Sequence, residues 1–316
     1  MADRIASLGA TNAVVDSDCL LVGPSRRGTS EHALARQAWW GSFVDPIGGD
    51  RKMGRVVVWV SSTNLRERVG LWRVCDRLRE YRIPRKDIVI VELDPPSRGP
   101  DTRESAVPTW CSASELGTLP ARLTEARPWP RDRYWRAVRL WSRYTAADPR
   151  PLAQNCARGI EGFPELAPLW ALLSSFFPRR TTEGTLRLSR FDELLMTALS
   201  SEWQTPLAVI SRDLRSGMAL WRMLSCAGDL FLPRRLEHWA DHDASAAVER
   251  APGPKPPDAG YPMLSEVYRL TERGMRLRDE GLTRLTDAPS LPIAGAEAYS
   301  ASAPWVLLED GRLARP

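Results

Sequence analysis

Two helix starts follow each other in residues 188–216, which read LSRFDELLMTALSSEWQTPLAVISRDLRS. Ser189, followed three residues later by Asp192, is like a capping box, and apolar residues then recur at helical spacing. Thr205 and Pro206 supply an N-cap and a first-position proline for a second helix, over Leu207 to Leu214. This stretch therefore predicts two short consecutive helices.

The chain after residue 216 extends this pattern. It predicts a third helix after Gly228-Asp229, a short strand at 267–270 and a last helix capped by Thr271. Three short helices with a strand pair indicate a winged-helix-like domain over 183–316. Residues 243–262, rich in Pro, Ala and Gly, are expected to be a mobile insertion in it. The residues expected to share its core are Phe191, Leu214, Leu236 and Leu270.

The third predicted helix occupies the position that a winged helix often lays on DNA. Its inward-facing residues are expected to be Leu232, Leu236 and Trp239. Its outward-facing residues, and thus its nucleic-acid-binding candidates, are then Arg234, Arg235 and His238. Arginine reads guanine edges or grips phosphate, but Glu237 and Asp241 give the same helix a mixed charge. Since winged helices also dock proteins, both nucleic acid and a protein remain possible partners.

Strands and helices alternate in the first part of the chain. The apolar runs Val56–Val60 and Ile88–Val91 read as buried strands, separated by an amphipathic helix over Leu65–Arg82. Upstream, a strand near Val14–Val22 and a helix over Glu31–Phe43 continue the alternation. This order predicts a small Rossmann-like parallel sheet in an α/β domain covering residues 1–112.

Two turns in this domain are candidate ligand sites. The first connects a strand to a helix at 23–30, where backbone amides and two arginines suit a phosphate. Its cofactor-binding candidates are Gly23, Arg26, Arg27 and Gly28. The turn matches no established phosphate-binding motif, so a basic surface turn is the simpler interpretation.

The second turn, Ser61-Ser62-Thr63-Asn64, follows the most apolar strand, at the sheet edge where parallel sheets place ligands. Ser61 and Thr63 are its cofactor-binding candidates, because hydroxyls and free amides at a helix start suit an anion. No base or carboxylate pair accompanies them in this turn, and N-capping of the following helix is the simpler interpretation.

Residues 113–182 are expected to form a helical connector between the two domains. Pro130 is placed as a first-position proline before a helix over Arg131–Ala147. On that helix three more nucleic-acid-binding candidates recur at i, i+3 and i+7: Arg136, Arg139 and Arg143. Such a stripe can follow a phosphate backbone, with Trp135 stacking on a base, although a solvated polar face is the simpler interpretation.

Composition limits the remaining possibilities. The chain has 316 residues and a net charge of +5, but all except three of its 44 basic residues are arginine, a skew typical of GC-rich genomes. The charge therefore permits an anionic partner without requiring one. Five scattered cysteines without C-x-x-C spacing indicate neither a disulfide framework nor a zinc ribbon, and they favour a reducing cytoplasm. No apolar run has the length of a membrane span.

One histidine pair has metal-ligand spacing. His238 and His242 are separated by four residues, which places both imidazoles on one helical face. The motif is not H-E-x-x-H, and no third ligand stands at a defined spacing. We therefore expect no metal site, and no cofactor is indicated by any motif.

A set of short motifs recurs in a familiar order from Ala13 to Leu313. The set comprises Leu20-Leu21-Val22-Gly23-Pro24, Trp39-Trp40, Val57-Val58-Trp59-Val60, Trp141, Asp148-Pro149, Phe163-Pro164-Glu165-Leu166, Phe176-Phe177-Pro178, Leu188-Ser189-Arg190-Phe191-Asp192-Glu193, Gly228-Asp229-Leu230-Phe231 and Leu270-Thr271-Glu272-Arg273-Gly274. The chain thereby resembles bacterial proteins that combine domain of unknown function 1835 with domain of unknown function 3658. The resemblance implies a Rossmann-like front and a winged-helix-like rear, and it carries no established activity.

Three departures separate the chain from that family. Met1–Asn12 lacks the first strand ending in Gly-Asp, Ser61–Asn64 replaces a stretch bearing an acid or a histidine, and Gly295-Ala296 replaces a Gly-Gly pair. If the family's front domain holds a pocket, these departures predict that part of it is lost here. From the winged-helix-like pattern and the lack of any catalytic motif, we expect a cytoplasmic, non-catalytic regulatory or adaptor protein that binds nucleic acid or a protein through its winged-helix-like domain. The alternative is an enzyme or sensor that binds a nucleotide or phosphorylated metabolite in the front domain.

Overall fold

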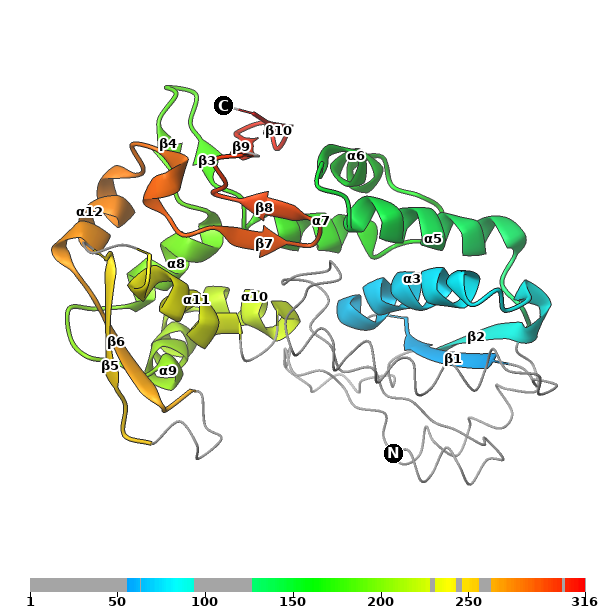
Figure 1. The fold of residues 1–316 in the computed structure, drawn as a ribbon, viewed down its shortest axis with the longest axis horizontal. Coiled ribbons are helices and arrows are strands. Elements are labelled where there is room, and N and C mark those ends of the chain that lie inside the picture. Colours follow the sequence, from blue (N-terminus) through cyan, green and yellow to red (C-terminus); the bar gives the residue numbers. More distant parts are fainter. Residues whose placement is uncertain are drawn as a thin grey trace. The chain divides into compact units, whose positions relative to one another are not determined.

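The computed structural model describes residues 56–62, 64–93, 127–227, 231–242, 246–255, 263–302 and 305–315. They form a mixed α/β structure with small sheets (Figure 1). These residues divide into two compact units. Unit 1 takes those up to Thr145 together with Glu161–Glu165, and unit 2 takes Ala146–Ile160 together with the residues from Leu166 onward. The range 113–182, expected to be one connector, is thus shared between the units.

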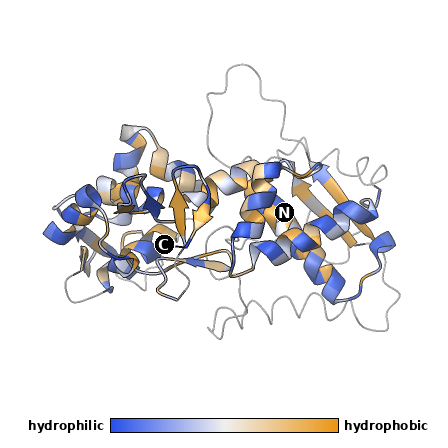
Figure 2. Cartoon of the chain, turned by 90° about the horizontal axis from the view of Figure 1, so that it is seen from above, coloured by the Kyte–Doolittle hydropathy of each residue, from blue (hydrophilic) through white to orange (hydrophobic). Residues whose placement is uncertain are grey.

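Unit 1 is built on a parallel strand pair. Strands β1 (Val56–Ser61) and β2 (Ile88–Leu93) run parallel, with Val57 opposite Val89. The helix α3 (Leu65–Glu80) and the short 3-10 turn η1 (Arg85–Asp87) connect them. Figure 2 shows the strands as apolar and the neighbouring helices as mixed in hydropathy. The predicted strand–helix–strand order and parallel pairing are confirmed here.

Helix α3 buries one apolar stripe. Val69, Trp72, Cys75 and Leu78, which recur at helical spacing, are buried as predicted. The face also contains Arg68, which is equally buried although it carries a charge. A polar partner must therefore lie within the core of unit 1.

Helix α5 (Arg131–Tyr144) packs against α3 and closes the core of unit 1. Pro130 was expected to be the first helical residue but is the N-cap of α5. The helix ends at Tyr144, three residues before the predicted end at Ala147. The Trp72 ring meets the edges of Tyr144 and Phe163 at centroid distances of 6.4 and 6.5 Å. Tyr134 of α5 donates a hydrogen bond of 2.8 Å to the Cys75 carbonyl, which fixes the register of the two helices.

Unit 2 is mainly helical, with three small antiparallel or mixed sheets. Its helices are α6 (Arg150–Arg158), α7 (Leu166–Ser174), α8 (Arg190–Ala198), α9 (Pro206–Ser216), α10 (Ala219–Ala227), α11 (Phe231–Ala240) and α12 (Glu272–Glu280), with the 3-10 turn η3 (Leu285–Asp287). Its strands are β3 (Arg179–Arg180), β4 (Leu186–Arg187), β5 (Val248–Pro252), β6 (Glu266–Leu270), β7 (Leu291–Ile293), β8 (Ala296–Ala298), β9 (Val306–Leu308) and β10 (Leu313–Ala314). The sheets are β10-β9-β3-β4, β5-β6 and β7-β8.

Three predicted helix starts of this unit are confirmed, whereas the start predicted at Gly228-Asp229 lies outside the described residues. Ser189 accepts a hydrogen bond from the Asp192 amide at the start of α8, and Thr205 accepts one from the Ala208 amide at the start of α9. Thr271 caps α12 in the same way, accepting from the Gly274 amide. Each cap satisfies an amide that the first helical turn leaves without a partner.

The core of unit 2 differs from expectation at one residue. Phe191, Leu236 and Leu270 are buried as predicted, but Leu214 is 43% exposed. Helix α9 turns a different face inward, because Asp213 is buried and accepts the Leu220 and Trp221 amides at the start of α10. Helix α10 itself was not predicted.

A strand pair follows α11, as expected of the C-terminal region. Strands β5 and β6 are antiparallel, with Val248 opposite Leu270. β5 occupies residues 248–252 of the range 243–262, which was expected to be an insertion. Gln204, just before α9, forms an isolated antiparallel bridge to Tyr268 of β6. The segment before α9 therefore lies against the edge of the β5–β6 hairpin.

Among the described residues, no helix is long and apolar enough to cross a membrane.

Candidate functional site

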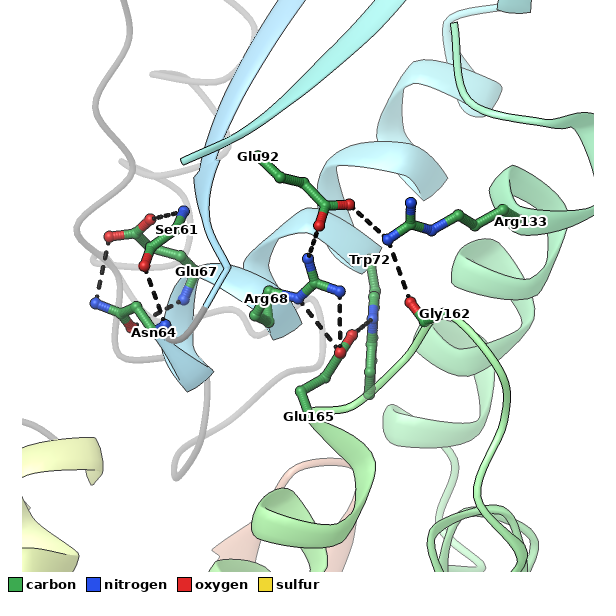
Figure 3. Close-up of polar contacts among 9 residues, drawn as sticks. All are labelled: Ser61, Asn64, Glu67, Arg68, Trp72, Glu92, Arg133, Gly162 and Glu165. Atoms are coloured by element: carbon green, nitrogen blue, oxygen red, sulfur yellow. Dashed lines mark hydrogen bonds and ion pairs between the residues drawn. The ribbon is translucent and has the colours of Figure 1, made fainter. Parts of the chain in front are cut away.

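The carboxyl edge of β1 carries the candidate Ser61. Its backbone N–H donates to Glu67 Oε2 at 2.6 Å, and Asn64 Nδ2 donates to Glu67 Oε1 at 3.2 Å (Figure 3). The Asn64 side chain in turn caps α3 by accepting from the Arg66 and Glu67 amides. The chain's own carboxylate thus occupies the donors that an anion would use, which favours N-capping over ligand binding at Ser61.

Thr63 and the turn with Gly23, Arg26, Arg27 and Gly28 lie outside the described residues.

A buried ion pair missed by the sequence analysis lies next to this edge. Arg68 donates from Nε and Nη2 to Glu165 Oε2 at 3.2 and 3.1 Å, and Trp72 Nε1 donates to Glu165 Oε1 at 2.9 Å (Figure 3). Glu92 of β2 faces Arg68 Nη1 at 3.1 Å and also pairs with Arg133 of α5. Two arginines and two carboxylates therefore balance each other in charge.

This charge balance limits what the cluster can do chemically. Both oxygens of Glu165 already accept hydrogen bonds, and the residue is 5% exposed. A carboxylate that is buried and paired in this way is poorly placed to exchange a proton with a ligand in solvent. The cluster instead attaches residues 161–165 to α3, and we assign it a structural role.

The arginine stripe on α5 lies on the outer face of the helix. Arg136, Arg139 and Arg143 are exposed, whereas Tyr134, Val138 and Trp141 on the opposite face are buried. Within the described part of the chain, no hydrogen bond or ion pair occupies these three guanidinium groups. Trp135 lies beside them and is 39% exposed. The structure thus places all four side chains on one accessible face, as expected.

The predicted positions of the α11 residues are confirmed for some of them and wrong for one. Leu232, Leu236 and Trp239 are buried as predicted, and Arg234 is exposed. The expectation that Arg235 faces solvent is wrong, since this residue is 1% exposed. Arg235 lies three residues after Leu232 and four before Trp239, and these spacings place it on the buried face.

The partner of Arg235 is Asp192 of α8. Arg235 donates from Nε to Asp192 Oδ1 at 2.8 Å and from Nη2 to Oδ2 at 2.9 Å, and both side chains are completely buried. Trp239 Nε1 donates to Oδ1 and Ser189 Oγ to Oδ2, each at 2.9 Å. The carbonyls of Pro289 and Ser290 accept from Arg235 Nη1. This group, the Asp192–Arg235 cluster, is an internal connection and offers nothing to a ligand.

The remaining surface of α11 has mixed charge. Partial burial and the positive charge of Arg235 lower the pKa of His238, so the imidazole is neutral at pH 7. Arg250 of β5 pairs with Glu237 at 3.3 Å and with Asp241 at 3.0 Å. Arg234 is thus the one exposed cation that α11 contributes from its described residues.

The possible histidine metal pair acquires no further ligands in the described residues, where no group of three or more metal-binding side chains is gathered. His242 lies beyond the end of α11, and its Nε2 is 2.9 Å from the Thr286 carbonyl oxygen.

Comparisons with known proteins give no family. No protein-family model, curated protein or solved structure matches the chain. The resemblance to proteins with domains of unknown function 1835 and 3658 therefore stays a prediction.

Proposed function

We propose that this protein is a non-catalytic binding protein that contacts nucleic acid through the outer face of α5. The observation that carries the proposal is the set of exposed guanidinium groups of Arg136, Arg139 and Arg143, unoccupied within the described residues. Arginines in a row along a helix suit a row of phosphates.

The geometry of α5 supports this proposal. At a rise of about 1.5 Å per residue, Arg136 and Arg143 are about 10 Å apart along the helix axis. Arg139 lies between them on the same face, and Asp132 is the only acidic residue of the helix. Like charges at i+3 and i+4 destabilise a helix, so an anionic partner would relieve a repulsion that the free protein retains.

Unit 2 supports a second part of the proposal, a docking role for a winged-helix-like region. Its order of α8, the Gln204 bridge, α9, α11 and the β5–β6 hairpin is compatible with a winged helix that has α10 added. The mixed charge of α11 favours a protein partner over phosphates at that helix. We therefore propose that the nucleic-acid contact lies on α5 and not on α11, although the sequence indicated candidates on both helices.

The salt dependence of binding tests the proposal. Replacing Arg136, Arg139 and Arg143 together by alanine should weaken nucleic-acid binding and reduce the slope of log K against log salt concentration by roughly 2 to 3. Fluorescence anisotropy with a labelled oligonucleotide at several salt concentrations measures this slope.

Two control variants make the result specific. The Arg158→Ala/Arg215→Ala/Arg276→Ala variant removes the same number of exposed charges from unit 2 and should keep the wild-type slope. Arg234→Ala should also keep it. A slope that changes with Arg234 but not with the α5 arginines would move the contact to α11 and reject the proposal.

A further inference from the structure

We propose that the α5 surface binds single-stranded rather than duplex nucleic acid, with Trp135 as the platform on which an unpaired base stacks. This inference rests on the proposed function and specifies its ligand. It depends on how Trp135 is held and on what surrounds it.

Trp135 is an exposed aromatic side chain on a helix whose opposite face is buried. Tyr134, Ala137, Val138 and Trp141 on the same helix are all buried, whereas Trp135 projects from the opposite face and remains 39% exposed. Its ring is nevertheless supported, because the Tyr134 ring meets it edge-on at a centroid distance of 5.7 Å and an angle of 81°. Tyr134 is itself fixed by its hydrogen bond to the Cys75 carbonyl.

This support leaves part of the indole available to a ligand. A supported ring loses little conformational entropy when a second flat group stacks on it. Base–aromatic stacking is also tolerant of sequence, because each base presents a π face. The indole of Trp135 is therefore suited to hold an unpaired base.

The arginines around Trp135 supply the second half of the site. Arg139 follows Trp135 one turn later on the same face of α5, and Arg136 and Arg143 lie farther round that face, beyond Arg139. A base stacked on Trp135 would bring its flanking phosphates toward these guanidinium groups. Aromatic platforms combined with a basic track are the recurring arrangement of proteins that bind single strands.

A duplex fits this surface less well. Its bases are already stacked on each other, so Trp135 could reach a base face only by unstacking a step of the double helix, which is energetically costly. The phosphates of a duplex would still meet the arginines. We therefore expect the arginines to contribute to binding of both forms and Trp135 to binding of single strands alone.

The experiment compares four forms of the full chain with matched probes. The probes are a labelled mixed-sequence single strand of about 20 nucleotides, as DNA and as RNA, and the DNA duplex made from it. The proteins are the wild type, Trp135→Ala, Trp135→Phe and the control Trp203→Ala. Trp203 is a tryptophan of unit 2 that is 43% exposed, with the guanidinium carbon of Arg269 at 4.6 Å from its ring centroid.

We expect Trp135→Ala to weaken single-strand binding between about 5-fold and about 100-fold, and to leave duplex binding unchanged. Trp135→Phe should restore most of the single-strand affinity, since phenylalanine keeps an aromatic face, and Trp203→Ala should bind like the wild type. Equal or tighter duplex binding by the wild type, or an unchanged single-strand affinity of Trp135→Ala, overturns the inference.

The arginine variants distinguish a failure of the single-strand inference from a failure of the proposed function. If the triple α5 arginine variant loses affinity while Trp135→Ala does not, α5 binds nucleic acid without a stacking platform, and only the single-strand inference fails. If neither variant changes binding, or if the wild type binds no probe at low salt, both proposals fail.

Discussion

At the scale of single residues, the Asp192–Arg235 cluster places a fully buried ion pair in the interior of unit 2. Burial by itself raises the pKa of Asp192, but the charge of Arg235 and the hydrogen bonds from Arg235 and Trp239 outweigh it and lower the pKa. A carboxylate whose pKa is lower in the folded than in the unfolded state stabilises the fold above its unfolded pKa, about 3.9. This stabilisation is lost as the pH falls through the folded pKa.

Asp192→Asn should therefore lower the free energy of unfolding by about 3 to 5 kcal/mol near neutral pH, because it leaves Arg235 buried without a countercharge. The free energies of unfolding of the variant and the wild type should approach each other as the pH falls below about 4. Denaturant titrations at several pH values measure both free energies. The exposed Asp310→Asn should leave the denaturation midpoint unchanged, and a pH-independent effect of Asp192→Asn would contradict the assigned ionisation.

At the scale of elements, α5 retains repulsion on its outer face. Arg139 lies three residues after Arg136 and four before Arg143, and each like-charge pair costs about 0.2–0.5 kcal/mol. Arg139→Ala should therefore raise the free energy of unfolding by roughly 0.5 to 1 kcal/mol, with a small contribution from the higher helix propensity of alanine. Thermal or denaturant unfolding monitored by circular dichroism measures the change.

The matched control for this helix is Arg276 of α12. It stands four residues from both Glu272 and Glu280, so Arg276→Ala removes opposite-charge neighbours and should not stabilise the protein. Equal stabilisation by both substitutions would mean that alanine propensity, rather than relief of repulsion, explains the effect on α5.

At the scale of the whole molecule, each unit has a buried cysteine among the described residues. The rate at which its thiol is labelled reports how often that unit opens. Burial, and to a smaller extent the charge of Asp76, raises the pKa of Cys75 in unit 1 to about 12. Cys156 is buried in unit 2. Neither thiol should react with a modifying reagent until its own unit opens.

Glu165→Gln weakens the ion pair with Arg68 and should accelerate labelling of Cys75 while leaving Cys156 unchanged. Asp192→Asn should do the reverse. Peptide-level mass spectrometry after timed labelling distinguishes the two sites. If either substitution accelerated both thiols equally, the units would open as one cooperative body.

Much of the local structure was predictable from short-range chemistry. The caps at Ser189, Thr205 and Thr271 satisfy helix amides within three residues, so the signal and its cause lie in the same segment. The parallel pairing of β1 and β2 followed from two apolar runs separated by an amphipathic helix. The exposed α5 stripe followed from helical periodicity alone.

Local reasoning did not predict the burial of two arginines, Arg68 and Arg235. Arg68 and Arg235 each occur at a helical position in phase with buried apolar residues, and this phase was a signal that they face the core. Their charge indicated solvent instead. Only their partners resolve the conflict, and Glu165 and Asp192 lie 97 and 43 residues away in the chain.

The sequence by itself determined the starts of α8, α9 and α12, the alternation of β1, α3 and β2, and which side of α5 carries its arginines, because these depend on neighbours within a few residues. Tertiary structure alone decided that Arg235 belongs to the core and that Leu214 does not. A buried charge or an exposed leucine depends on the free energy of contacts between distant segments, and no local pattern records which segments will meet.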